Sequence, residues 1–169
     1  MPNHTPEGLD SVDNVVEQWA KEKPQLDTLS MASMGRLARL SKHLEQGIAV
    51  CHNEHELKAG EFDVLATLRR SGGDYCLTPS ALLASMMLTS GAMTHRLDRL
   101  ESKALIVRVH SKQDRRSVSV ALSDSGLTLI DKVIESHVET QNKLMGALTD
   151  VDKFHLNQLL KKCLFQFER

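Results

Sequence analysis

The sequence has few aromatic residues, few cysteines and almost no net charge. Phe, Trp and Tyr make up 4% of its 169 residues, so the core must come from Leu, Val, Ile, Met and Ala, which suits a helical protein. Three scattered cysteines, Cys51, Cys76 and Cys163, indicate reduced thiols rather than a disulfide framework. A net charge of −1 excludes a generally basic surface, so any contact with nucleic acid must be local.

Membrane, secretory and catalytic signals are also missing. No apolar run approaches membrane-spanning length without polar interruption, and residues 1–8 lack the basic and apolar parts of a signal peptide. The sequence shows no nucleophile paired with a base, no paired acids in a catalytic motif and no Gly-rich phosphate loop. We therefore expect a cytoplasmic protein that has no membrane contact, is not an enzyme and needs no cofactor or metal.

Residues 78–122 predict two helices followed by a β-hairpin. Thr78 is a good N-cap, Pro79 suits a first helical position, and the first helix ends near Leu88. A second helix follows from Ser90 to about Lys103. The alternating segments 106–110 and 117–122 predict strands, joined by a charged tip. These are the parts of a winged helix-turn-helix.

The second helix has an apolar and a polar face. Met93, Leu97 and Leu100 recur at helical spacing, and the residues that lie away from this stripe are polar: Thr94, His95, Asp98, Arg99 and Ser102. Residues 91–116 carry a net charge of +4, whereas the rest of the chain carries −5. Positive charge is thus concentrated on the segment that would face phosphate, which favours recognition of duplex DNA.

Long helices are expected on both sides of this segment. We predict a mainly α fold with a small β-wing, as a single domain over residues 1–169. Its winged helix-turn-helix spans about 61–122, and dimerisation helices span about 11–56 and 123–169. Ser11 is expected to cap the first helix, Ser123 and Thr149 the last two. The apolar arc of the last two helices is wider than one neighbour needs, which predicts a homodimer.

Several segments resemble the MarR family of bacterial transcriptional regulators. They are Glu61–Leu68, Met87–Glu101, the triplet Asp114-Arg115-Arg116 and Val120–Gly126. The resemblance implies a homodimeric repressor that binds a double-stranded, pseudo-palindromic operator and is released by a small molecule. We expect the DNA contacts to come from the following residues: Thr89, Ser90, Gly91, Thr94, His95, Arg99, Lys112, Arg115 and Arg116.

A narrower resemblance is to the urate-responsive, PecS-like subgroup of this family. Trp19, Asp63, Arg96 and Arg108 match its four ligand-binding positions. This implies a planar anionic effector such as urate, stacked on Trp19 and paired with arginine.

Simpler readings of these residues stay open. Arg96 lies at the flank of the apolar stripe and could pair with Asp63 or Glu101 instead of a ligand. Trp19 could only anchor the first helix to the core, and Arg108 could be a solvated edge residue. The whole chain could instead be a winged-helix protein-interaction module, or a thiol redox sensor without a ligand.

Three details bear on this interpretation. His52 and His55 have a spacing that can ligate a metal, but the sequence shows no evident third ligand. His95 stands where many family members carry Arg, which weakens the case for a strong guanine contact. Ala104 stands where Gly is usual, and a left-handed turn there would cost roughly 1 kcal/mol.

The charged tip of the wing yields a direct test. Replacing Arg115 or Arg116 by Ala should weaken duplex binding and flatten its salt dependence, because fewer counterions are released. His95→Ala should instead relax base preference. Binding measured across a salt series checks this, and wing variants that bind as tightly as wild type at every salt concentration would contradict it.

Overall fold

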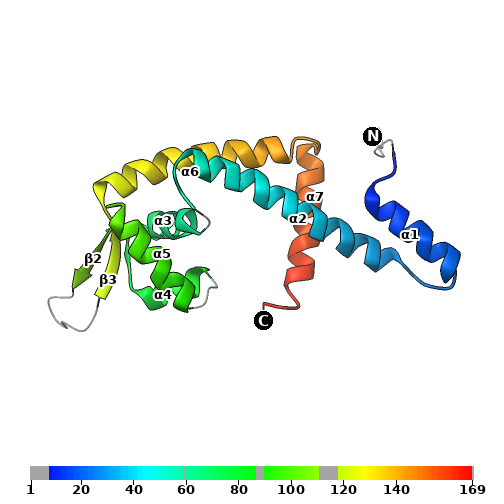
Figure 1. The fold of residues 1–169 in the computed structure, drawn as a ribbon, viewed down its shortest axis with the longest axis horizontal. Coiled ribbons are helices and arrows are strands. Elements are labelled where there is room, and N and C mark those ends of the chain that lie inside the picture. Colours follow the sequence, from blue (N-terminus) through cyan, green and yellow to red (C-terminus); the bar gives the residue numbers. More distant parts are fainter. Residues whose placement is uncertain (1–7, 59, 87–89, 111–117, 169) are drawn as a thin grey trace. The chain divides into compact units, whose positions relative to one another are not determined.

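The computed structural model describes residues 8–58, 60–86, 90–110 and 118–168. These residues form a mainly helical fold with a small β-sheet, as predicted (Figure 1). The sheet is antiparallel and contains a third strand besides the two expected in the wing. The chain divides into two compact units, Met1–Gln46 and Gly47–Arg169. Within the described ranges, no helix has both the length and the apolar character needed to cross a membrane.

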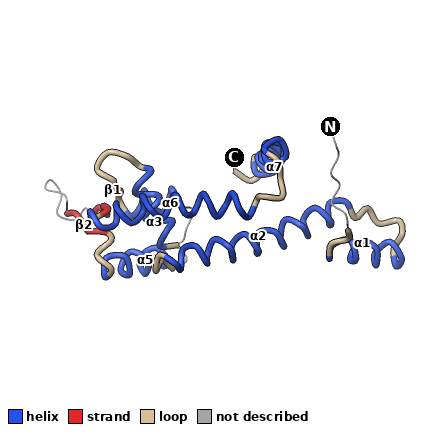
Figure 2. Tube along the Cα trace, turned by 90° about the horizontal axis from the view of Figure 1, so that it is seen from above, coloured by secondary structure: helices blue, strands red, loops and turns tan. Residues whose placement is uncertain are grey.

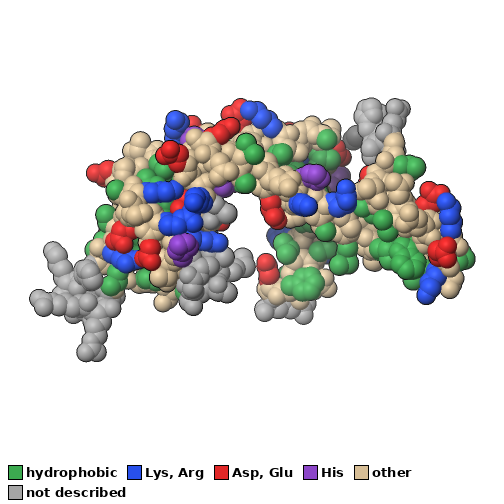
Figure 3. Space-filling model, in the orientation of Figure 1, with side chains coloured by type: hydrophobic (Ala, Val, Ile, Leu, Met, Phe, Trp, Pro, Cys, Tyr) green, Lys and Arg blue, Asp and Glu red, His purple; other side chains and the backbone are tan. Residues whose placement is uncertain are grey.

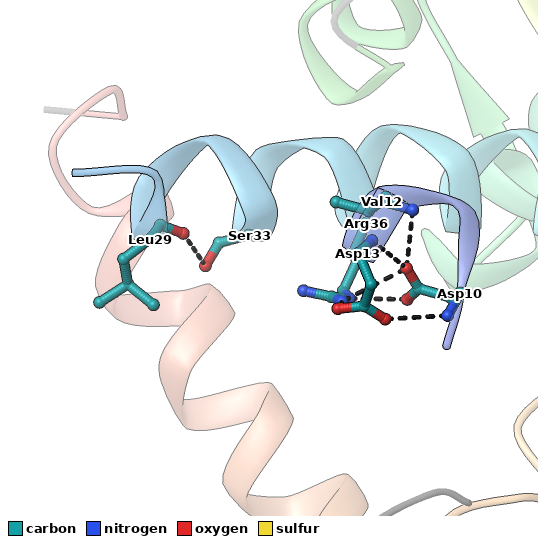
Figure 4. A network of polar contacts seen from close by, with 6 residues as sticks. All are labelled: Asp10, Val12, Asp13, Leu29, Ser33 and Arg36. Atoms are coloured by element: carbon teal, nitrogen blue, oxygen red, sulfur yellow. Dashed lines mark hydrogen bonds and ion pairs between the residues drawn. The ribbon is translucent and has the colours of Figure 1, made fainter. Parts of the chain in front are cut away.

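The first unit contains α1 (Ser11–Glu22) and the first part of α2 (Leu29–Glu54). Asp10 caps α1 in a capping box with Asp13, so the prediction that Ser11 is the cap is wrong by one residue. Arg36 of α2 donates from Nε to Asp10 Oδ2 over 2.7 Å and also binds Asp13 (Figure 4). The hydrogen bonds from Arg36 and from the Asp13 N–H lower the pKa of Asp10 to about 2. This ion pair attaches α1 to α2.

The apolar stripe of α1 is only partly buried. Val12 is 7% exposed, whereas Val15 is 42% and Trp19 38% exposed. The simpler interpretation, that Trp19 anchors α1 to a hydrophobic core, is therefore not fulfilled within the single chain.

The second unit holds the main hydrophobic core. It packs α3 (Glu61–Arg70), α4 (Pro79–Met86), α5 (Ser90–Ser102) and α6 (Asp124–Leu144). Thr78 Oγ1 accepts from the Ala81 N–H and Ser123 caps α6, both as predicted. The largest fully buried apolar side chains are Leu57, Leu65, Leu68, Leu82, Met93, Leu100, Ile106 and Ile130. The final helix, α7 (Asp150–Leu164), is capped by Thr149, as predicted, in a capping box with Asp152.

The sheet has the strand order β1-β3-β2. It consists of β1 (Cys76–Leu77), β2 (Ile106–His110) and β3 (Val118–Leu122), with Arg108 opposite Val120. Figure 1 shows β2 and β3 side by side near α5, and Figure 2 shows the strands in red beside the same helix. The sheet therefore places the wing strands beside the second helix of the helix-turn-helix.

The turn between α5 and β2 is left-handed at Ala104, whose φ is +56°. A Cβ is strained in this region, so Ala104→Gly should raise the free energy of unfolding by up to about 1 kcal/mol. Ala49 lies exposed inside α2, and there the same exchange should cost about 1 kcal/mol. Denaturant unfolding of both variants checks this. A loss of stability at both positions would show that the turn stores no such strain.

Candidate functional site

The helix α5 has the two faces that its sequence predicts. Met93, Leu97 and Leu100 are at most 4% exposed and belong to the core. Thr94 and His95 are exposed on the other side of the helix. Lys and Arg side chains gather over α3 and α5 in Figure 3, on the part of the unit that would meet phosphate.

The structure places only some of the predicted DNA contacts. Ser90 and Gly91 lie in the first turn of α5, and Thr94 and His95 lie on its exposed face. Four predicted contacts lie outside the described residues: Thr89, Lys112, Arg115 and Arg116.

Arg99 does not point away from the protein as its helical position suggested. Its Nε donates to Glu61 Oε1 over 2.9 Å, and its Nη2 lies 2.6 Å from the same oxygen. The Arg99 side chain is only 29% exposed. The predicted outward orientation is therefore wrong, because α3 presents a buried carboxylate to this side of α5.

Glu61 was not singled out as a site residue from the sequence. It is the first residue of α3, where an acid usually serves the helix dipole in solvent, yet here it is fully buried. Its Oε2 accepts from Lys103 Nζ at 2.9 Å and from the Lys58 N–H at 2.8 Å. Burial alone would raise the pKa of Glu61, but the hydrogen bonds from Lys103, the Lys58 N–H and Arg99 outweigh it and lower the pKa.

Arg108 holds the opposite flank of α5. From strand β2 it binds Asp98, and its Nη1 lies 3.4 Å from Glu101 Oε2. Arg108 is therefore neither a purely solvated residue nor an unpaired cation. Its partners are partly exposed acids of α5, so each pair contributes little to stability.

Arg96 faces inward, against the first turn of α3. A Cβ added at Gly60 would lie 2.1 Å from Arg96 Cζ, so the guanidinium packs directly on the glycine backbone. Within the described ranges, neither Asp63 nor Glu101 forms an ion pair with Arg96, and its Nη1 is buried without a hydrogen-bond partner. A buried guanidinium nitrogen without an acceptor is costly, which makes this position suited to an anion.

The remaining two predicted ligand residues lie in different units. Asp63 is exposed on α3, three residues after Gly60, and so lies near the turn that Arg96 contacts. Trp19 belongs to the first unit. The second unit thus brings Arg96 and Asp63 to the same end of α3.

His52 does not form a pair with His55. Its Nε2 lies 3.1 Å from His137 Nδ1, and the Phe62 ring stacks on both imidazoles at centroid distances of 4.2 and 4.4 Å. Burial lowers the pKa of His52 and of His137. Among the residues that the structure describes, no group of three or more His, Cys, Asp or Glu could hold a metal ion. Cys51 next to it is a buried free thiol.

Comparison with known proteins agrees with this geometry. The model of the MarR family matches residues 57–118. The HTH-type transcriptional regulator PecS of Dickeya dadantii is 38% identical over 149 residues, which cover 88% of this chain and 90% of PecS. The multiple antibiotic resistance protein MarR of Salmonella typhimurium is 32% identical over 110 residues, or 64% of this chain and 74% of MarR.

A solved structure shows the same fold bound to DNA. It is the C80S mutant of E. coli MarR complexed with operator DNA, with a TM-score of 0.70 and 27% identity. The similarity covers 81% of this chain and 97% of that one. The fold and the two-faced helix α5 thus define a winged-helix transcriptional regulator. The chain belongs to the MarR family.

Proposed function

We propose that this regulator is a homodimeric repressor that leaves a pseudo-palindromic operator when it binds a small planar anion such as urate. The observation that carries the proposal is the buried Nη1 of Arg96, which has no protein acceptor among the described residues and lies on the helix that would read DNA. An anion there would pair with Arg96 and act on α5 directly.

The DNA-binding part rests on α5 and on the relatives. Thr94 and His95 are exposed on the face of α5 opposite the core, and a single helix of this kind fits the major groove. E. coli MarR, which shares this fold, is complexed with operator DNA. We propose that Thr94 and His95 meet base edges, with the wing arginines at the neighbouring backbone or minor groove.

The dimer is supported by apolar side chains that a single chain leaves in solvent. On α7 and just beyond it, Val151, Phe154, Leu159, Leu164 and Phe165 are each more than half exposed. Exposed apolar surface of this extent marks a protein interface, and two copies on one operator require symmetry. We propose that the last two helices carry the contact between two copies.

The effector position is supported by the electrostatics of α3. The N-terminus of this helix carries a partial positive charge, and Gly60 offers no side chain to cap it. Arg96 places a guanidinium at the same turn, and its buried Nη1, which has no acceptor among the described residues, can pair with an anion. Asp63 supplies an exposed acceptor near that turn for a ring N–H. Trp19 and Arg108 stay predictions as further contacts.

Two glycines offer a matched test of the effector position. Gly60 and Gly72 both have positive φ, so Ala strains either backbone, but an added Cβ meets Arg96 at Gly60 and nothing within 4 Å at Gly72. Gly60→Ala should therefore displace Arg96 and weaken urate binding by about tenfold or more, the value of a charged hydrogen bond, while Gly72→Ala leaves it unchanged. Isothermal titration calorimetry with urate measures both.

The same titration tests the switch. Operator DNA should weaken urate binding by the factor by which urate weakens operator binding, since the coupling free energy is reciprocal. No binding of urate by the wild type, or urate affinity that operator DNA leaves unchanged, would contradict the proposed switch. Equal urate affinity in the two glycine variants would remove Arg96 from the site.

A further inference from the structure

The carboxylate of Glu61 connects α3 to Arg99 of α5 and to Lys103, the residue that follows α5, in the interior of the second unit. Oε1 binds Arg99, and Oε2 binds Lys103 and the Lys58 N–H. Glu61 is fully buried, while its two cationic partners are about one-third exposed. We call Glu61, Arg99 and Lys103 the Glu61 clasp.

We propose that Glu61 is a positioning residue for operator recognition, which sets the rotation of α5 about its axis through Arg99 and Lys103. Lys103 directly follows α5, and its N–H still donates to the Arg99 carbonyl oxygen over 3.1 Å, so the two cations lie one helical turn apart on the same side. Two attachments along one side of a helix fix its rotation as well as its distance from α3. The inference rests on the proposed binding of DNA by α5.

The clasp differs from the other attachments of α5. The pairs of Arg108 with Asp98 and Glu101 are partly exposed, so solvent screens them. The apolar contacts of Met93, Leu97 and Leu100 hold α5 on the core but are not directional. The hydrogen bonds to a buried carboxylate are directional, and replacing a whole buried ion pair by well-packed apolar residues is often neutral for stability. Orientation is therefore what the clasp adds to the fold.

Lys103 extends the clasp to the segment that precedes α3. Its Nζ also donates to the Glu56 carbonyl oxygen over 2.6 Å, in the connection between α2 and α3. The end of α5 is thus fixed to both the start of α3 and the segment before it. A tilt of α5 against α3 would break several charged hydrogen bonds together.

The clasp also assigns Arg99 a role other than a base or phosphate contact. Its guanidinium is held by Glu61 inside the protein and is therefore not directed at a phosphate. Loss of a phosphate contact reduces the salt slope of binding by about 0.9 per contact. Arg99→Met should therefore lower operator preference while leaving the salt slope unchanged, whereas a phosphate contact would lose about one unit of slope.

The test compares Glu61→Gln with Asp131→Asn in the full chain. Each variant replaces an ionised acid by an amide and so raises the net charge by one. Each also removes the acid of an ion pair in the same unit, since Asp131 binds Arg69 on the surface. The DNA is a labelled duplex that the wild type selects from a random pool, with a scrambled duplex of equal length as reference. Fluorescence anisotropy across a salt series gives the affinity for each.

The expected result is a loss of preference rather than a loss of binding. Glu61→Gln should reduce the ratio of selected to scrambled affinity by about tenfold or more and steepen the salt slope on the scrambled duplex, because Arg99 and Lys103 become available to phosphate. Asp131→Asn should leave the ratio unchanged. A merely structural role of Glu61 would lower stability and leave the ratio of the folded variant at the wild-type value, which would overturn the proposal.

Acid unfolding supplies a second readout. Because the pKa of Glu61 is lowered in the folded chain, its carboxylate contributes stability above the ordinary carboxyl range and loses it as pH falls through the lowered pKa. The difference in unfolding free energy between wild type and Glu61→Gln should therefore shrink on acidification, and a constant difference would contradict an ionised clasp.

If Glu61→Gln does not fold, Arg99→Met carries the same affinity test. A wild type that binds no duplex at any salt concentration would overturn the proposed function itself, whereas wild-type binding with an unchanged ratio in the variants overturns the positioning role alone.

Discussion

The second unit depends on one buried negative charge that must be kept paired. Glu61 is fully buried beside the core residues Phe62 and Leu65, where an unpaired carboxylate would cost several kcal/mol. Arg99, Lys103 and the Lys58 N–H compensate this cost together. Arg99 belongs to the helix that would read DNA, Lys103 directly follows that helix, and Lys58 lies in the segment before α3. The fold of the helix-turn-helix and the orientation of α5 are therefore parts of one electrostatic arrangement.

The proposed effector position lies next to this arrangement. Arg96 packs on Gly60, the residue before Glu61, so Arg96 and Arg99 of α5 and Lys103 just after it face the same end of α3. Two of them are paired with Glu61, and Arg96 Nη1 has no acceptor among the described residues. Because Arg96 belongs to α5, an anion bound by Arg96 would act on α5 directly, next to the contact between α5 and Glu61. The ligand can shift α5 only by as much as its affinity differs between the two orientations.

The sequence predicts elements well where the signal is local, and it fails where a distant residue decides. The helix capped by Ser123 and the strand Ile106–His110 form as predicted, because the cap, the apolar spacing and the alternation lie within each segment. The cap of α1 is an exception, because Asp10 and Asp13 form a capping box, a local signal that the expectation of Ser11 missed. Arg99 turns inward because α3 presents Glu61, a contact between residues 38 apart that helical spacing does not contain. The predicted strain at Ala104 appears because the left-handed turn is a local property.

The pKa of the Glu61 carboxyl group is the measurement that tests this account most directly. A titration of the folded chain followed by side-chain carboxyl NMR should give a midpoint below the ordinary glutamate value, since the charged hydrogen bonds outweigh burial. Lys103→Met should move that midpoint upward, because the hydrogen bond from Lys103 lowers the pKa of Glu61 more than the other hydrogen bonds do. A midpoint at or above the ordinary value in the wild type would show that burial outweighs the hydrogen bonds and that Arg99 and Lys103 do not hold this carboxylate.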